Sequence, residues 1–349
     1  SKDPADGKAQ AKLYADGIEK ETGTRPVIFY TNGYETWLWD DHATSQSEPR
    51  KVHGFYSQQS LEYLIWRRVE AAKLSSVTPD QKILGDRDYQ YESLSAICGA
   101  FDQGKRKVLA VQATGTGKTR LAVALTDVVL KANAGRRILF LCDRRELRKQ
   151  AKNAFDAFLS APSTFLSKDS LGELSNQLYF ATYPAMAKIY KQLDPGFFDL
   201  IIADESHRSV YNVYGDLFRY FDGLQLGLTA TPVEMVSRST CRLFGCDFGE
   251  PTANYPLERA IEEGYLVPFS VVKHTTRFLR EGIKGDTLTP EQVLGAEERG
   301  EDLTQLDFDA EQIDRAIHNK DTNRMVLRNL MENGLCMADG QTLGKSIIF

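Results

Sequence analysis

The residues best suited to chemistry form a short glycine-rich segment between an apolar run and a helical pattern. From Val108 to Thr119 the sequence reads VLAVQATGTGKT, which predicts a strand, a loop and the start of a helix, the context of a phosphate-binding P-loop. Gly115 and Gly117 allow backbone N–H groups to turn toward a phosphate at the helix N-terminus, where the helix dipole favours anions. Lys118 can reach the β- and γ-phosphates, and the Thr119 hydroxyl can bind Mg²⁺.

A pair of acidic residues follows another apolar run. Residues 200–207 read LIIADESH, so Asp204 and Glu205 come at the end of a predicted strand. An acidic residue in this place can hold Mg²⁺ through water, which is the role that we expect of Asp204. Glu205 would orient the attacking water and take its proton. Together with the P-loop, the pair predicts hydrolysis of a nucleoside triphosphate and not binding alone.

Two threonines follow a third apolar run, in the segment 228–232 (LTATP). Thr229 and Thr231 can hydrogen-bond to the acidic segment and to a neighbour that moves, which would couple hydrolysis to motion.

Gln112 stands where the strict P-loop motif has glycine, so the phosphate site is a variant of that motif.

Short apolar runs alternate with helical patterns across the middle of the chain. Continuous apolar runs separated by helices are typical of an α/β fold, a parallel sheet with helices on both faces. The predicted strands are residues 108–111, 138–142, 178–181, 200–203 and 226–229.

Both ends of the chain have the pattern of interrupted domains. Lys8–Lys20 has helical spacing, and the Asn-Gly pair at 32–33 predicts a hairpin with a type I′ turn. Residues 310–333 read as a helix, and residues 345–349 as a strand that begins another α/β unit. We therefore expect further sheet before the first residue and further sequence after the last.

Composition narrows the function classes. The 349 residues carry a formal net charge of −5, whereas a protein that wraps nucleic acid with its whole surface is strongly basic. The charge disfavours such a protein, whereas a motor that holds DNA in one local groove is compatible with it. No apolar run reaches the ~18–20 residues that span a bilayer, so we expect no membrane partner. The five cysteines are scattered, and we expect reduced thiols in a cytoplasmic protein.

Together these segments resemble the motor of superfamily-two helicases. Residues 113–119 match motif I, residues 204–207 motif II and residues 229–231 motif III. The resemblance implies a RecA-like fold with ATP and Mg²⁺ as cofactors. It implies that Lys118, Asp204 and Glu205 are catalytic, that Thr119 and Asp204 hold Mg²⁺, and that His207 acts in coupling with Thr229 and Thr231. The implied nucleotide-binding residues are Arg87, Gln90, Thr114, Gly115, Thr116, Gly117, Lys118 and Thr119.

Other segments resemble the motifs with which this family reads adenine and contacts DNA. Residues 87–90 (RDYQ) are similar to the Q motif, which makes Gln90 the candidate for the adenine edge. Residues 141–147 resemble motif Ia and residues 181–183 motif Ib, which touch the DNA backbone in this family. The implied DNA contacts are Arg144, Arg145 and Thr182, with Arg148 and Lys149 as further candidates.

Within the superfamily, the sequence resembles the restriction (R) subunit of type I restriction–modification enzymes. The segments that carry this likeness are 112–120 (QATGTGKTR), 143–147 (DRREL), 204–209 (DESHRS) and 257–268 (LERAIEEGYLVP). Gln10 and Tyr14 resemble the Gln-x-x-x-Tyr element that follows the catalytic Asp…Glu-x-Lys of the nuclease in these subunits. The likeness therefore implies the C-terminal part of a PD-(D/E)xK-type nuclease domain ahead of the motor.

The resemblance also implies how the chain is divided and what it does. The implied segments are 1–75 (nuclease part and linker), 80–250 (first RecA-like ATPase lobe), 251–305 (connection) and 306–349 (start of a second lobe). The implied function is ATP-dependent translocation on double-stranded DNA and cleavage of unmodified foreign DNA, with methyltransferase (M) and specificity (S) subunits as partners. The nuclease metal ligands and the arginine finger would lie outside this sequence. We therefore expect residues 1–349 alone to bind ATP, hydrolyse it poorly and leave DNA uncut.

Two other function classes stay open at this point. Another superfamily-two enzyme, such as a type III restriction subunit, a repair helicase or an RNA helicase, would share the three motifs, although type III subunits carry their nuclease after the motor. A non-catalytic, ATP-gated nucleic-acid-binding module would use nucleotide only as a switch. Such a module would not need Glu205.

Overall fold

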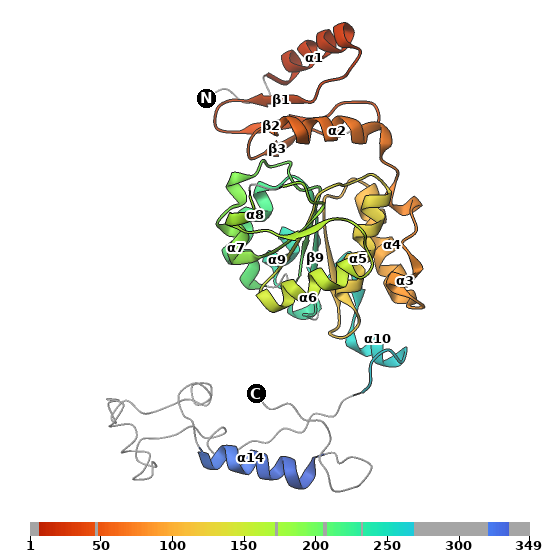
Figure 1. Cartoon of the computed structure of the whole chain (residues 1–349), viewed down its shortest axis with the longest axis vertical. Helices are drawn as coiled ribbons and strands as arrows, with labels where there is room; N and C mark the ends of the chain where they lie inside the picture. The colour runs from red at the N-terminus through yellow and green to blue at the C-terminus, as the bar shows by residue number, and fades with distance from the viewer. Residues whose placement is uncertain are drawn as a thin grey trace, which may run out of the picture. The chain divides into compact units, whose positions relative to one another are not determined.

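The computed structural model describes residues 7–45, 48–171, 174–204, 208–231, 233–268 and 320–334. The chain divides into two units, Ser1–Pro268 and Phe269–Phe349, and each is described by itself. In the first unit, a small antiparallel sheet precedes a larger α/β sandwich (Figure 1). In the second, the described part is one helix, α14 (Lys320–Asn333).

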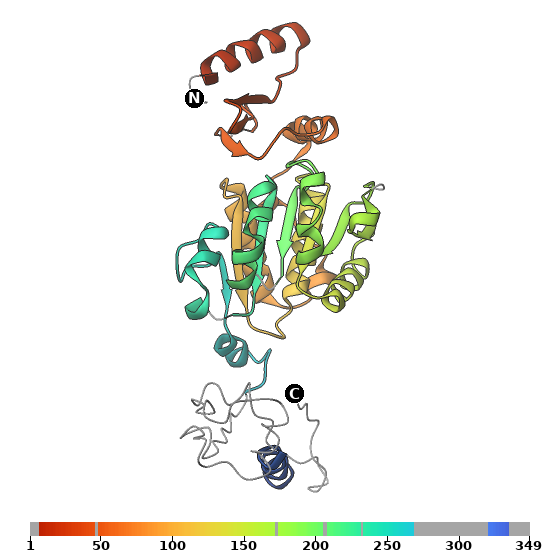
Figure 2. The ribbon, with the colours of Figure 1, turned by 90° about the vertical axis from the view of Figure 1, so that its left-hand side faces the viewer.

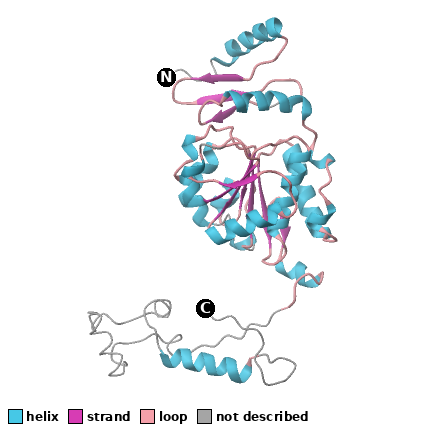
Figure 3. Cartoon of the chain, viewed as in Figure 1, coloured by secondary structure: helices cyan, strands magenta, loops and turns pink. Residues whose placement is uncertain are grey.

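The α/β sandwich is built on seven parallel strands, which lie between helices in Figure 3. They are β4 (Lys107–Gln112), β5 (Ile138–Cys142), β6 (Ser163–Phe165), β7 (Leu178–Thr182), β8 (Leu200–Ala203), β9 (Leu224–Thr229) and β10 (Ala253–Tyr255). Their order across the sheet is β10-β4-β9-β8-β5-β7-β6, and every neighbouring pair is parallel. The predicted parallel sheet and its five predicted strands are thus confirmed.

Helices cover both faces of this sheet (Figure 2). Because alternate residues of a strand point to opposite faces, Val108 and Ala110 pack into one buried cluster, and Leu109 and Val111 pack into the other. The first cluster lies under α4 (Asp88–Asp102), α5 (Lys118–Lys131) and α6 (Arg145–Asp156), and the second under α7 (Tyr183–Ala187), α8 (Arg208–Tyr220) and α9 (Arg238–Leu243). Burial on both faces explains why the strands read as continuous apolar runs. The shorter helices are η2 (Leu74–Ser76), α3 (Gln81–Leu84), η3 (Lys168–Ser170), η4 (Tyr190–Gln192), η5 (Val233–Met235) and α10 (Leu257–Glu262).

The N-terminal part is a three-stranded antiparallel sheet with one helix before it and one after it. The elements are α1 (Lys8–Thr22), β1 (Ile28–Thr31), β2 (Thr36–Trp39), β3 (Arg50–Val52) and α2 (Gln58–Glu70), and the sheet order is β1-β2-β3. The predicted helix at 8–20 and the hairpin after it are therefore confirmed.

The turn type predicted for this hairpin is wrong. Thr31 pairs with Thr36, so the loop has four residues instead of two. The Asn32 side chain accepts hydrogen bonds from the backbone N–H groups of Tyr34 (3.0 Å) and Glu35 (2.8 Å). Gly33 has a φ of 88°, whereas Asn32 does not have the positive φ that a type I′ turn requires. The local hydrogen bonds of the asparagine side chain set the longer loop.

Two short elements after residue 250 belong to the sandwich. β10 pairs with β4 in parallel, with Ala253 beside Ala110, and α10 follows it directly. The sheet thus extends beyond residue 250, where we expected the lobe to end. The sequence does not reveal β10, because a strand of three residues is too short to show a pattern. The rest of the domain division stays a prediction. The predicted strand at 345–349 and residues 310–319 of the predicted last helix lie outside the described residues.

The described cysteines are free thiols, as expected. They are Cys98, Cys142, Cys241 and Cys246. Burial raises the pKa of the Cys98 and Cys142 thiols to about 12, so they stay protonated and unreactive near neutral pH. Within the described ranges, no helix combines the length and the apolar character that crossing a membrane requires.

Candidate nucleotide site

The loop after β4 has the backbone geometry of a phosphate cradle. Gly115 and Gly117 have φ values of 89° and 98°, in the left-handed region that glycine adopts at little cost. Gly117 is the N-cap of α5, so the first N–H groups of this helix have no acceptor within it. Lys118 and Thr119 stand half-buried on the first turn, and Thr114 is exposed in the loop. Donors of this kind at a helix N-terminus favour a phosphate.

Two residues of α4 hold the backbone of this loop in place. Nε2 of Gln90 donates hydrogen bonds to the carbonyl oxygens of Thr116 (2.7 Å) and Gly117 (3.3 Å). The Tyr89 hydroxyl donates to the same Thr116 carbonyl at 2.6 Å. Gln90 is fully buried, and its Oε1 has no hydrogen-bond partner among the residues that the structure describes. The structure therefore brings Gln90 to the phosphate loop, while its contact with adenine stays a prediction. Arg87, the N-cap residue of α4, is half-buried.

Two polar side chains of the cradle turn inward. The Thr116 hydroxyl donates to the Ala113 carbonyl at 2.7 Å, so this side chain shapes the loop. Gln112, which replaces the glycine of the strict motif, is buried and donates through Nε2 to Ser93 Oγ at 3.2 Å. Because Ser93 belongs to α4, the variant residue ties the end of β4 to this helix.

A tyrosine stack connects the cradle to the segment after β10. The Tyr89 ring lies parallel to Tyr255 with 3.9 Å between the ring centroids, and Tyr265 meets it edge-on at 4.7 Å. A Cβ at Gly115 would lie 3.3 Å from Cδ2 of Leu266, so the end of this segment touches the phosphate loop. The sequence alone predicts no role for these tyrosines. Only the place of Tyr89 within RDYQ hinted at one.

The sheet order brings the three predicted motifs to one edge. β4 leads into the phosphate loop, β9 ends at Thr229, and β8 leads into Asp204, and these strands are neighbours in the order β4-β9-β8. Thr229 is buried, and its hydroxyl accepts a hydrogen bond from the Thr231 N–H at 3.1 Å. The Asp204 N–H donates to the Leu141 carbonyl at 2.8 Å. Glu205 and His207 lie outside the described residues.

Tyr183 is a buried link to Asp204 that the sequence alone does not predict. Its hydroxyl donates to the Asp204 carbonyl oxygen at 2.7 Å, and its ring stacks on Tyr214 of α8 with 5.4 Å between centroids. Tyr183 directly follows Thr182, a predicted DNA contact that is itself buried. The place of Tyr183 in the segment that resembles motif Ib is the only feature of the sequence that points to it.

The predicted DNA contacts differ in their access to solvent. Arg144 and Arg145 are exposed at the start of α6, as is Lys149. Arg148 is half-buried, and its guanidinium lies 4.4 Å from the centre of the Phe165 ring. Arg144 and Arg145 are thus placed to meet a phosphate backbone, whereas Arg148 is engaged within the lobe.

The predicted nuclease residues share one face of α1. Nε2 of Gln10 donates to the Tyr14 hydroxyl at 3.0 Å, and both side chains are exposed. The spacing of four residues produces this contact.

Comparison with known proteins agrees with the motifs. The family model described as "Type III restriction enzyme, res subunit" matches residues 83–234. The EcoAI endonuclease subunit of a type I restriction enzyme from Escherichia coli is 33% identical over 71% of this chain and 32% of its own length. The EcoKI endonuclease subunit from Escherichia coli K12 is 28% identical over 89% of this chain and 30% of its own length.

Among solved structures, a fragment of an HsdR subunit of a type I restriction enzyme from Vibrio vulnificus is 26% identical with a TM-score of 0.44, over 75% of this chain and 47% of that one. The chain spans about a third of the length of the curated relatives that it matches. The motif wording and the alignments to the curated subunits together support an R-type (HsdR) subunit of a type I restriction enzyme, with a superfamily-two helicase-like motor.

Proposed function

We propose that this chain is the motor-bearing part of a cytoplasmic, ATP-dependent DNA translocase and endonuclease subunit of a type I restriction enzyme. The observation that carries the proposal is the phosphate cradle after β4 with Asp204 two strands away, in a chain of this family. The proposed substrate is unmodified double-stranded DNA, which the enzyme cuts after translocation.

ATP and Mg²⁺ fit the residues that are present. Backbone N–H groups of the cradle and the Lys118 ammonium suit phosphate, and the Thr119 hydroxyl and the Asp204 carboxylate are oxygen ligands of the kind that Mg²⁺ prefers. When bound, Mg²⁺ neutralises charge that develops on the phosphates. Glu205 would accept the proton of the attacking water. Thr229 and Thr231 would couple ATP hydrolysis at the nucleotide site to movement of neighbouring elements.

DNA and partner subunits complete the proposal. Arg144 and Arg145, exposed at the start of α6, would contact the DNA backbone. Methyltransferase and specificity subunits would supply target recognition. Gln10 and Tyr14 would serve the nuclease of this enzyme.

ATP hydrolysis by the full-length subunit, with and without its partner subunits, tests this function. We expect hydrolysis that needs the partners and unmethylated duplex DNA, and little hydrolysis on methylated DNA. Hydrolysis without partners that is driven by any nucleic acid and separates strands would instead show a stand-alone helicase. Binding of ATP without any hydrolysis would show the ATP-gated module.

Tyr183→Phe should weaken the response of hydrolysis to DNA. The change removes one hydroxyl that holds the Asp204 carbonyl, and a lost hydrogen bond of this kind is worth roughly 1 kcal/mol, or about fivefold. We expect DNA-stimulated ATP hydrolysis to fall by about this factor. The matched control is Tyr220→Phe, which removes a similar bond to the Leu193 carbonyl (2.6 Å). Equal rates for the two variants would show that Tyr183 does not position Asp204.

A further inference from the structure

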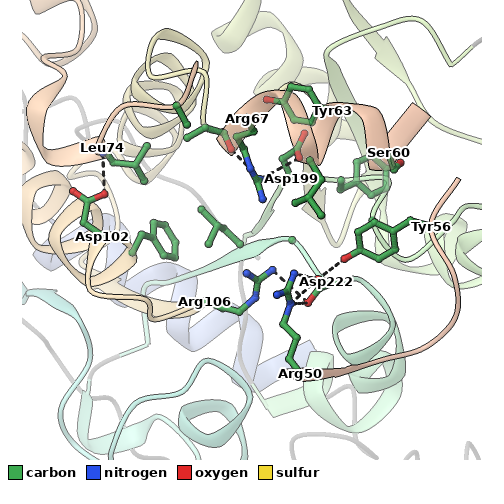
Figure 4. Close-up of a pocket in the computed structure, with 18 of the residues that line it drawn as sticks. Arg50, Tyr56, Ser60, Tyr63, Arg67, Leu74, Asp102, Arg106, Asp199 and Asp222 are labelled. Atoms are coloured by element: carbon green, nitrogen blue, oxygen red, sulfur yellow. Dashed lines mark hydrogen bonds and ion pairs between the residues drawn. The ribbon is translucent and has the colours of Figure 1, made fainter. Parts of the chain in front are cut away.

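A cluster of polar and charged side chains joins the N-terminal segment, which runs from α1 to α2, to the α/β sandwich, which we call the motor lobe (Figure 4). We call it the basal cluster. It contains Arg50, Tyr56 and Arg67 from the N-terminal segment and Arg106, Asp199 and Asp222 from the lobe, around a cavity of about 200 Å³. None of these residues belongs to the nucleotide site.

Asp222 is the centre of the basal cluster. Its carboxylate accepts hydrogen bonds from Nε and Nη2 of Arg50, at 2.8 and 2.7 Å, and another from the Tyr56 hydroxyl. Arg106 lies 3.4 Å from the other oxygen. Burial acts to raise the pKa of Asp222, but Arg106 and Arg50 outweigh it and hold this pKa below its ordinary value. Asp222 is thus kept charged and clamped to a residue 172 positions away in the chain.

A second contact, at Asp199, is looser. One oxygen of Asp199 accepts the backbone N–H groups of Arg136 (2.8 Å) and Arg137 (3.0 Å), and Arg67 lies 3.5 Å from the other. The distances from Arg67 to Asp199 and from Arg106 to Asp222 are longer than that of a normal charge-assisted hydrogen bond. Arg67 also donates to the Ala134 carbonyl at 3.2 Å, whereas Arg50 holds its carboxylate with two nitrogens.

The Tyr56 ring closes the cluster against the lobe. A Cβ at Gly196 would lie 2.3 Å from this ring, so glycine is needed for the close approach. The Asp222 N–H also donates to the Pro195 carbonyl at 2.8 Å, which ties the two loops together.

Each lobe residue of the basal cluster stands just before a strand that leads to a nucleotide motif. Arg106 directly precedes β4, which leads to the phosphate loop, and Asp199 directly precedes β8, which leads to Asp204. Asp222 comes two residues before β9, which leads to Thr229. The cluster thus lies at the amino ends of three neighbouring strands whose carboxyl ends form the nucleotide site. A packed, hydrogen-bonded strand of four to six residues is a stiff element that can carry coupling between its ends.

We propose that the basal cluster is the joint through which movement of the motor lobe reaches the nuclease side of the chain, with Arg50 and Asp222 as positioning residues for DNA cleavage. The proposal rests on the proposed function, because it requires a motor and a nuclease in one protein. If the joint is loosened, ATP hydrolysis and translocation continue while cleavage loses its link to them.

The test uses the assembled full-length enzyme with Arg50→Ala, which removes the clamp on Asp222. We expect cleavage of unmodified duplex DNA to fall by about tenfold while the translocation rate stays within about twofold, a separation within the range of measured coupling energies. Arg50→Lys keeps the charge but cannot bind in the same two-pronged way, and should restore part of the cleavage. Lys51→Ala is the matched control, because the adjacent Lys51 forms an exposed pair with Glu35.

Two results would overturn the proposal. Equal loss of translocation and cleavage would show that the basal cluster only supports the fold, and unchanged cleavage would show that it transmits nothing. If Arg50→Ala fails to fold in thermal unfolding, Tyr56→Phe decides the question, since it removes one hydrogen bond to Asp222 and keeps the ring against Gly196. A wild-type enzyme that neither translocates nor cuts would instead contradict the proposed function itself.

Discussion

Lys118→Ala is expected to reduce ATP hydrolysis by about 10²–10³-fold, the range for losing one preorganised charge at a developing anion. The backbone N–H groups of the phosphate cradle and the Thr119 hydroxyl remain in this variant, so nucleotide binding should fall less than the rate does. The missing ammonium is the group that would reach the β- and γ-phosphates as charge moves between them. Steady-state hydrolysis by the assembled enzyme on unmodified DNA measures the effect.

Lys131→Ala is the control for this variant. Lys131 lies at the other end of α5, where its exposed ammonium pairs with the buried Asp127, so its loss should leave hydrolysis unchanged. Thermal unfolding of both variants checks that they fold. If Lys118→Ala hydrolysed ATP at a rate close to that of Lys131→Ala, the cradle after β4 would not be the catalytic site.

Gln90→Glu is expected to raise the KM for ATP by about 10–100-fold. The substitution removes the Nε2 donor that holds the Thr116 and Gly117 carbonyls and places carboxylate oxygens against them. Breaking buried hydrogen bonds in this way costs roughly 1–3 kcal/mol of free energy. The rate at saturating ATP should change less, because Lys118 and Asp204 stay in place. Gln103→Glu, on the exposed residue just after the same helix, is the matched control.

Nucleotide selectivity separates two roles of Gln90. Its Oε1, without a partner among the described residues, can accept a hydrogen bond from the amino group of adenine, whereas guanine presents an acceptor there. If Gln90 reads adenine, Gln90→Ala will lose preference for ATP over GTP. If it only supports the phosphate loop, the KM values for both nucleotides will rise by the same factor.

Much of the motor lobe could be predicted from sequence because its signals are local. Strands buried on both faces give continuous apolar runs, and the glycines of the cradle are needed at positive φ, so β4, β5 and the phosphate loop were recognisable. The type I′ turn failed because a side-chain hydrogen bond of Asn32 competes with the two-residue loop. The very short strands β6 and β10 carry no period that a sequence can show.

The contacts that position the site could not be predicted, because they join residues far apart in the chain. Tyr183 reaches Asp204 across 21 residues, and Tyr89 reaches the Thr116 carbonyl across 27. Arg50 finds Asp222 across 172. Each residue type is ordinary on its own, and only the folded sheet brings the partners together. Gln90 lies beside the phosphate loop and contacts its backbone, which no sequence pattern specifies, and its contact with adenine stays a prediction.

The central claim is that ATP hydrolysis by the motor lobe drives DNA cleavage. Its most direct test is cleavage of unmodified circular duplex DNA by the assembled full-length enzyme, with either the wild-type subunit or Lys118→Ala. The account predicts that the wild-type enzyme cuts unmethylated DNA only with ATP, Mg²⁺ and both partner subunits, and that Lys118→Ala leaves the DNA intact. Cleavage by Lys118→Ala at the wild-type rate, or cleavage without ATP, would contradict it, because the motor lobe would then have no part in cutting.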